Sequence, residues 1–240
     1  CGGGVGVFSL SAIDSNFSFK YSEISNNTAE GDELEIYGSP AFYGGGGLLV
    51  ASSTNVGISN STISGNSLET QFGGGIHIPR PNATASVKYS TVVDNYAGYD
   101  GGGIFSDSTD CNVLNSLLSG NTTAGGSEQD MTGASDCSVS HSLLAGAVNS
   151  SFSDDGDNLL SIDPLIGPLA DNGGPTLTHA LLPGSPAIDQ GSSGSDVPPF
   201  DQRGQGYPRA FGIEIDMGAF EVSVDSLFSD RFEQVPIRMP

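Results

Sequence analysis

Apolar and polar positions in the first 147 residues repeat in an eleven-residue pattern, apolar-x-apolar-x-x-Ser-x-aliphatic. The copies occupy residues 17–27, 56–66, 85–95, 111–121 and 137–147. Their shared serines, Ser22, Ser61, Ser90, Ser116 and Ser142, lie 39, 29, 26 and 26 residues apart, spacings typical of solenoids. Because side chains alternate across a strand, the apolar columns are expected to face a core and the polar columns to face water.

Two further columns accompany this pattern. Glycine triplets at 2–4, 45–47, 73–75 and 101–103 each precede an aliphatic residue, and the last three triplets start 28 residues apart. Glycine triplets suit sharp corners of the backbone. A phosphate-binding loop is the alternative interpretation, but the helix and the Lys-Ser/Thr pair that it requires are missing from the sequence. Asparagines at one turn position are expected to hydrogen-bond along the stack: Asn27, Asn66, Asn95 and Asn121. The pattern predicts an all-β parallel β-helix, a solenoid.

Charge narrows the classes of partner. The 240 residues carry 28 acidic and 7 basic side chains, a formal net charge of −21. Such a chain repels phosphate backbones, so no nucleic acid partner is expected. The sequence also holds no apolar run near the roughly 20 residues that cross a bilayer, which predicts no transmembrane segment.

Two stretches carry a family resemblance. Coils with Gly-Gly-Gly-aliphatic followed by a strand ending in Ser-Gly-Asn resemble bacterial right-handed parallel β-helix proteins, including polymorphic outer-membrane-protein repeats. Residues 163–221 contain DPLIGPLADNGGPTLTHALLPGSPAIDQG and then FDQRGQGYPRAFGIEIDMGAFE, and they resemble the choice-of-anchor Q domain of bacterial surface and secreted β-helix proteins. The resemblance implies a right-handed helix and an extracellular or bacterial cell-surface location.

The expected organisation has three parts. Residues 1–147 form the parallel β-helix coils, 148–222 form an irregular, choice-of-anchor-Q-like capping segment, and 223–240 form a C-terminal tail. The Pro and Gly density of the second part predicts turns, and a solenoid end needs a cover for its strand edges. Cys1 is interpreted as a processed or lipidated N-terminus or as a truncation, and its open rung makes head-to-tail self-association a hypothesis.

Cys111 and Cys137 occupy the same inward column one coil apart. Neighbouring parallel strands lie slightly farther apart than a disulfide prefers, although strand twist reduces that gap. The sequence therefore leaves two alternatives open, a disulfide or a stack of buried thiols.

Candidate site residues lie mainly in one outward column. The residue before each serine is a ligand-binding candidate: Tyr21, Asn60, Tyr89, Asn115 and His141. Asp154, Asp155 and Asp157 surround a glycine and offer hard oxygen donors, so they are candidate calcium ligands, the one cofactor considered. Catalytic residues stay unknown, because the acids Glu23, Asp94, Asp100, Asp107 and Asp110 fall in different columns, mostly in turns.

These features favour a non-enzymatic extracellular or cell-surface β-helix protein that serves as an adhesin, stalk or fibre subunit. Its expected partners are a glycan, a host or neighbour-cell surface protein, or further copies of itself. A carbohydrate-active β-helix enzyme, either a polysaccharide lyase or a glycoside hydrolase, is the principal alternative, and a head-to-tail filament subunit is another.

Overall fold

The structure is a computed structural model that describes residues 5–7, 15–29, 34–36, 39–41, 45–50, 54–78, 83–107, 110–133, 137–148, 152–194 and 196–223. Cys1, the glycine triplet 2–4 and tail residues 224–240 lie outside these ranges. The described chain consists of strands, turns and irregular segments, and it contains no helix. Its strands stack in parallel, which confirms the predicted all-β solenoid.

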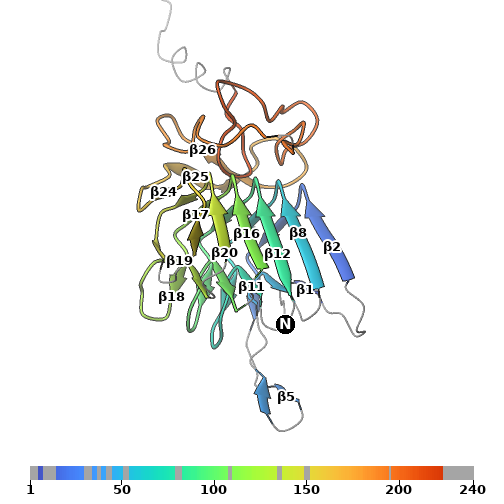
Figure 1. The fold of residues 1–240 in the computed structure, drawn as a ribbon, viewed down its shortest axis with the longest axis vertical. Helices are drawn as coiled ribbons and strands as arrows, with labels where there is room; N and C mark the ends of the chain where they lie inside the picture. The colour runs from blue at the N-terminus through green and yellow to red at the C-terminus, as the bar shows by residue number, and fades with distance from the viewer. Residues whose placement is uncertain are drawn as a thin grey trace, which may run out of the picture.

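Two long sheets, named here A and B, run along the coils (Figure 1). Sheet A contains β1 (Val5–Val7), β7 (Leu48–Val50), β11 (Ile76–Ile78), β15 (Ile104–Ser106), β19 (Gln129–Gly133) and β22 (Ala147–Val148). Sheet B contains β2 (Ser15–Lys20), β8 (Thr54–Ser59), β12 (Thr84–Lys88), β16 (Asp110–Leu114), β20 (Cys137–Ser140) and β23 (Ser153–Asp154). Each strand pairs with its counterpart one coil away.

Two further parallel sheets, C and D, complete the coils. Sheet C contains β3 (Glu23–Ser25), β9 (Thr62–Ser64), β13 (Thr91–Val93), β17 (Leu117–Ser119), β21 (Leu143–Leu144) and β24 (Leu159–Leu160). Sheet D contains β4 (Thr28–Ala29), β10 (Ser67–Leu68), β14 (Tyr96–Ala97) and β18 (Thr122–Thr123). Parallel pairing therefore continues beyond the expected boundary at residue 147, as far as β24.

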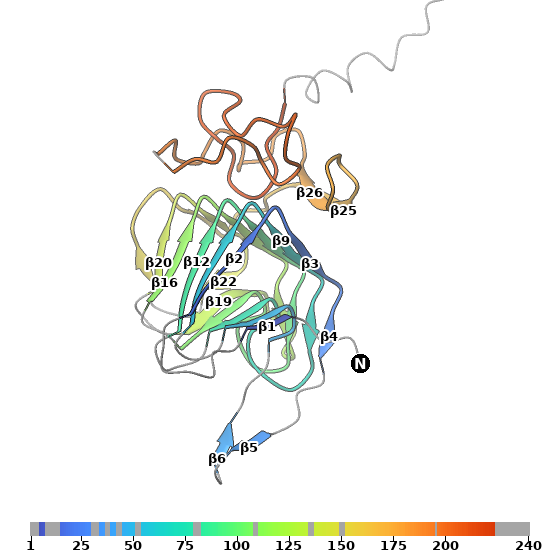
Figure 2. The same ribbon diagram turned by 90° about the vertical axis from the view of Figure 1, so that its right-hand side faces the viewer.

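Two antiparallel hairpins stand outside these sheets. One joins β5 (Leu34–Ile36) to β6 (Ser39–Ala41) and projects away from the coils (Figure 2). The other joins β25 (Ile166–Ala170) to β26 (Thr178–Leu181).

The core follows the apolar columns of the repeat. The column that begins with Phe17 pairs in register through Val56, Ala85, Cys111 and Cys137. From Val56 onward these side chains are buried and belong to one continuous cluster inside the coils. Intervening positions on the same strands are less buried, so the period-two alternation orients sheet B as the sequence predicts.

The shared serines form a continuous line at the corner between sheets B and C. The Ser22 amide donates to Ser61 Oγ at 3.2 Å, and the same bond recurs from Ser61 to Ser90, from Ser90 to Ser116 and from Ser116 to Ser142. Asn158 takes over the accepting role in the next coil, at 2.9 Å from the Ser142 amide. Each serine hydroxyl also donates to the carbonyl two residues before it, so both groups at the corner are satisfied.

The asparagine column forms a second ladder. The Asn27, Asn66 and Asn95 side-chain amides each donate 2.9 Å bonds to the next asparagine Oδ1. Glycine is needed beside this ladder, since a Cβ on Gly75 would lie 2.6 Å from the Gly103 carbonyl oxygen and 3.1 Å from Asn95 Nδ2.

The C-terminal segment, residues 163–194 and 196–223, is irregular as predicted (Figure 1). It lies along the flank of the coils, beside the carboxyl ends of the sheet B strands. Its contacts extend from Glu23, whose Oε2 accepts the Leu177 amide at 2.9 Å, to Asn115, which bonds Ser192. The segment therefore contacts successive coils along one flank, whereas the sequence predicts a cover for the end of the solenoid.

A second apolar cluster forms between the coils and the C-terminal segment. Val93, Leu117 and Leu143 project from the outer face of sheet C and pack against the C-terminal segment. The segment contributes buried side chains from Leu181, Ala187, Met217, Phe220 and Val222. Burial of this apolar area stabilises the docked segment.

Cys111 and Cys137 are in register on β16 and β20, and the structure joins them in a disulfide with a Cα–Cα distance of 4.4 Å.

We expect the Cys111→Ala/Cys137→Ala variant to lose about 2–4 kcal/mol of unfolding free energy, because the bond closes a loop across one coil. Denaturant unfolding with and without reductant measures this. Reductant should destabilise the wild type and leave the double variant unchanged, and equal midpoints for the oxidised and reduced wild type would contradict the expectation.

Candidate functional site

The column proposed to bind a ligand occupies the corner just before each serine. Every member has a left-handed backbone, with φ between 46° and 53°, and Asp157 at φ 56° continues the column by one coil. Asparagine, aspartate and histidine tolerate this conformation better than most residues, which accounts for part of the column's composition. The column is therefore a structural corner as well as an outward-facing row.

The C-terminal segment covers the middle of this column. Asn60 is 1% exposed and donates from Nδ2 to the Phe200 carbonyl at 3.0 Å. Asn115 is also buried and exchanges two hydrogen bonds with the Ser192 backbone, at 3.1 and 2.7 Å. Tyr89 is buried between them, so the expectation of an open ligand-binding face is corrected for these three residues.

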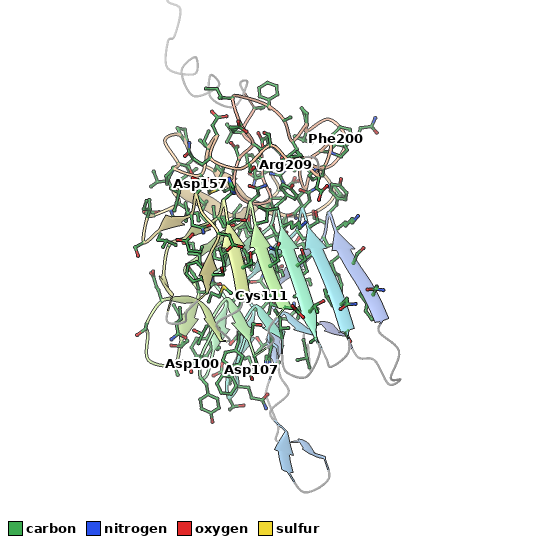
Figure 3. The ribbon with its side chains drawn as sticks, in the orientation of Figure 1. Asp100, Asp107, Cys111, Asp157, Phe200 and Arg209 are labelled. Carbon is green, nitrogen blue, oxygen red and sulfur yellow. A yellow bond between two sulfur atoms is a disulfide. The ribbon has the colours of Figure 1, made fainter. Side chains whose placement is uncertain are left out.

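A buried charged cluster holds the segment in place. It consists of Asp201, Arg203, Arg209, Asp216 and Glu221, all 7% exposed or less. Arg209 Nη2 donates to Asn60 Oδ1 at 2.6 Å, and Arg209 Nη1 lies 3.7 Å from Glu221 Oε2. Arg203 pairs with Asp201 at 2.6 Å and lies over the rings of Tyr207 and Phe220. Figure 3 shows Arg209 where the segment meets the coils.

This cluster contains three carboxyl groups and two guanidinium groups. Burial raises the pKa of Asp216 to about 6, and burial together with the Asp216 charge raises the pKa of Glu221 to about 8. Glu221 Oε1 and Arg209 Nε are buried without a hydrogen-bond partner. The cluster therefore favours retention of a proton near neutral pH. Sequence reasoning missed it, although residues 201–221 place six charged residues, five of them members of this cluster, in a Gly-, Pro- and aromatic-rich stretch.

The candidate calcium ligands do not converge. Asp154 Oδ1 accepts bonds from the Gly156 amide and Asn158 Nδ2, whereas Asp155 bonds Ser138 and Ser153. Asp157 Oδ2 lies 3.3 Å from His141 Nε2. No group of three potential metal ligands occurs among the described residues. This corrects the expectation of a shared calcium site.

His141 and Asp157 instead line a cleft of about 630 Å³ between the coils and the C-terminal segment. Asp189, Gln190, Ser193 and Glu214 line it from the segment side. Asp189 Oδ1 accepts the Ile213 and Glu214 amides at 3.0 and 3.3 Å, which fixes that carboxylate beside the cleft. The cleft thus brings two residues from separate predicted groups together with carboxylates that the sequence did not connect to them.

A second hollow is a groove of about 490 Å³ along sheet B. Five neighbouring strands line it, from β2 to β20, and the C-terminal segment contributes no residue to its lining. Asn16, Asn55, Thr84 and Asp110 form one row across the strands, and Gly57, Ser86, Asn112 and Ser138 form the next. Asn55 links its neighbours, donating to Asn16 Oδ1 at 3.0 Å and accepting from Thr84 Oγ1 at 2.7 Å.

The acids named as catalytic candidates remain dispersed. Glu23 binds the Leu177 amide, Asp94 occupies a left-handed corner and Asp110 lines the groove. Asp100 and Asp107 lie on the far side of the coils from Asp157 (Figure 3). The groove itself contains a single carboxylate side chain among its described lining residues, Asp110.

Comparisons with protein-family models, with curated proteins and with solved structures gave no match. In the described part of the chain, no helix is long and apolar enough to span a membrane.

The charged cluster predicts a pH dependence. A carboxyl group whose pKa is higher in the folded state than in the unfolded state stabilises the fold at low pH and loses that effect as pH rises through the folded value. We therefore expect the contribution of Glu221 to fall between about pH 4.5 and 8. Glu221→Gln should reduce the fall in unfolding free energy between these pH values, measured by denaturant unfolding at a series of pH values. The exposed Glu214→Gln is the matched control, and an unchanged slope in Glu221→Gln would contradict this expectation.

Proposed function

We propose that this protein is a non-enzymatic, extracellular or cell-surface β-helix that binds a polysaccharide along the groove of sheet B, as an adhesin or stalk does. One observation carries the proposal: the groove repeats amide and hydroxyl side chains across five strands and lies clear of the C-terminal segment. Short amides and hydroxyls match the repeating hydroxyl groups of a sugar chain.

The chemistry of the sheet favours a carbohydrate over a peptide. Strands β8, β12 and β16 are paired on both sides, so their backbone groups are not free to add a peptide strand. Recognition must then come from side chains, and the groove offers polar ones at every strand. The net charge of −21 and the disulfide support an oxidising, extracellular setting.

Filling the groove tests the proposal. A Cβ on Gly57 would meet only the Phe17 carbonyl oxygen, at 3.9 Å, so Gly57→Tyr places a ring in the groove without a backbone clash. Polysaccharide binding, measured by a glycan array and by calorimetry on the hits, should weaken by about tenfold or more, equivalent to about 1.4 kcal/mol.

Gly125→Tyr is the matched control, because its Cβ would meet only Ser127 Oγ, at 4.0 Å, in a turn away from the groove. This variant should bind like the wild type. Equal weakening in both variants, or no polysaccharide binding by the wild type, would refute the proposed function.

A carbohydrate-active enzyme is the second candidate, and the cleft of His141, Asp157, Asp189 and Glu214 is the observation that favours it. Under the proposed function, incubation with bound polysaccharides releases no new reducing ends or unsaturated products over time. Product release that disappears in Asp157→Asn or Glu214→Gln, with binding to the groove retained, would establish the enzyme instead.

A further inference from the structure

We propose that the ligand of the sheet B groove is a linear, neutral polysaccharide whose chain runs along the axis of the coils, across the strands. This inference rests on the proposed function and specifies the class and direction of the ligand. Two observations carry it: the course of the groove, and the charges in and around its lining.

The course of the groove sets the direction of the chain. Its two polar rows each cross four strands and together cover β2, β8, β12, β16 and β20; neighbouring strands lie about 4.8 Å apart, so the groove spans about 19 Å from the first strand to the fifth. The rows are in register, so, except at Gly57, they present polar side chains at a constant interval along the coil axis. A linear polymer of repeating units can match such an interval, whereas a branched or compact ligand engages only part of it.

The charges in and around the groove favour a neutral polysaccharide over an acidic one. No lysine or arginine is among the described lining residues, and Asp110 contributes a carboxylate at the β16 end of its row. The nearest lysine column on the same sheet holds Lys20 and Lys88, in register through Ser59, but it lies outside the lining, and Lys88 is 4.0 Å from Asp196. A polyuronate would therefore meet an acidic protein without a cation in the groove to neutralise its carboxylates.

The inference predicts a dependence on ligand length. We expect the affinity for neutral cello- or xylo-oligosaccharides to rise by about tenfold or more from the disaccharide to chains that span the five strands, because each added unit brings further hydrogen bonds. Beyond that length the affinity should change less than about twofold, since no further groups of the groove are reached. Calorimetry on the full chain with oligosaccharides of two to eight units measures the plateau.

Oligogalacturonates of the same lengths test the charge. They should bind about tenfold more weakly than the better neutral series, and Asp110→Lys should narrow that gap, whereas Asp110→Asn should narrow it less. The exposed Asp171→Lys changes the net charge equally at a site outside the groove and should leave the ratio nearly unchanged.

The outcomes separate this inference from the proposed function. Tighter binding of oligogalacturonates that Gly57→Tyr still abolishes would overturn the neutral class and keep the groove as a binding site. An affinity that is independent of length would overturn the axial direction. Absence of binding by every neutral and acidic probe would count against the proposed function itself.

Discussion

The coils depend on a buried chain of hydrogen bonds that has one direction. Each asparagine amide donates to the next, and the last, Asn121 Nδ2, donates to Asp130 Oδ1 at 2.8 Å. Asp130 is fully buried and also accepts the Gly146 amide at 2.6 Å. Burial raises the pKa of Asp130, and these donors oppose that rise, so the carboxylate both completes the ladder and needs it. Removal of one member would leave buried polar groups unpaired in two coils.

The serine corner supplies hydrogen-bond partners for backbone amides at the edge between sheets B and C. A left-handed residue interrupts each strand pair there, and the serine hydroxyl replaces the missing partner for the neighbouring amide. The corner then presents carbonyls and side chains to the C-terminal segment, where Arg209 binds both Asn60 Oδ1 and the Gly218 carbonyl. The same corner therefore provides hydrogen bonds to the local backbone and binds a segment that is distant in sequence.

How much could be predicted from the sequence follows from the range of the interactions. Columns such as Ser61, Ser90 and Ser116 repeat because one local geometry recurs in each coil, so spacing alone aligned them correctly. Docking of the C-terminal segment leaves no repeat: Asn60 and Arg209 are 149 residues apart, and nothing local to Asn60 indicates that it is covered. His141 and Asp157 pair for a different reason: Asp157 continues the corner column by one coil, although it lies beyond the five copies of the repeat.

The same contrast explains why binding is better sought on sheet B than at the corner. At the corner, the shared serines satisfy backbone groups, and Asn60 and Asn115 hold the C-terminal segment. On sheet B the backbone pairs of the strands form the ladder, and the outward side chains add only bonds to one another, such as those of Asn55 with Asn16 and Thr84. Outward residues on this sheet differ from coil to coil, as Asn, Thr and Asp do in the row from Asn16 to Asp110. A solenoid can therefore keep its core repeat constant while one open face varies, and that freedom lets a structural repeat also serve as a recognition surface.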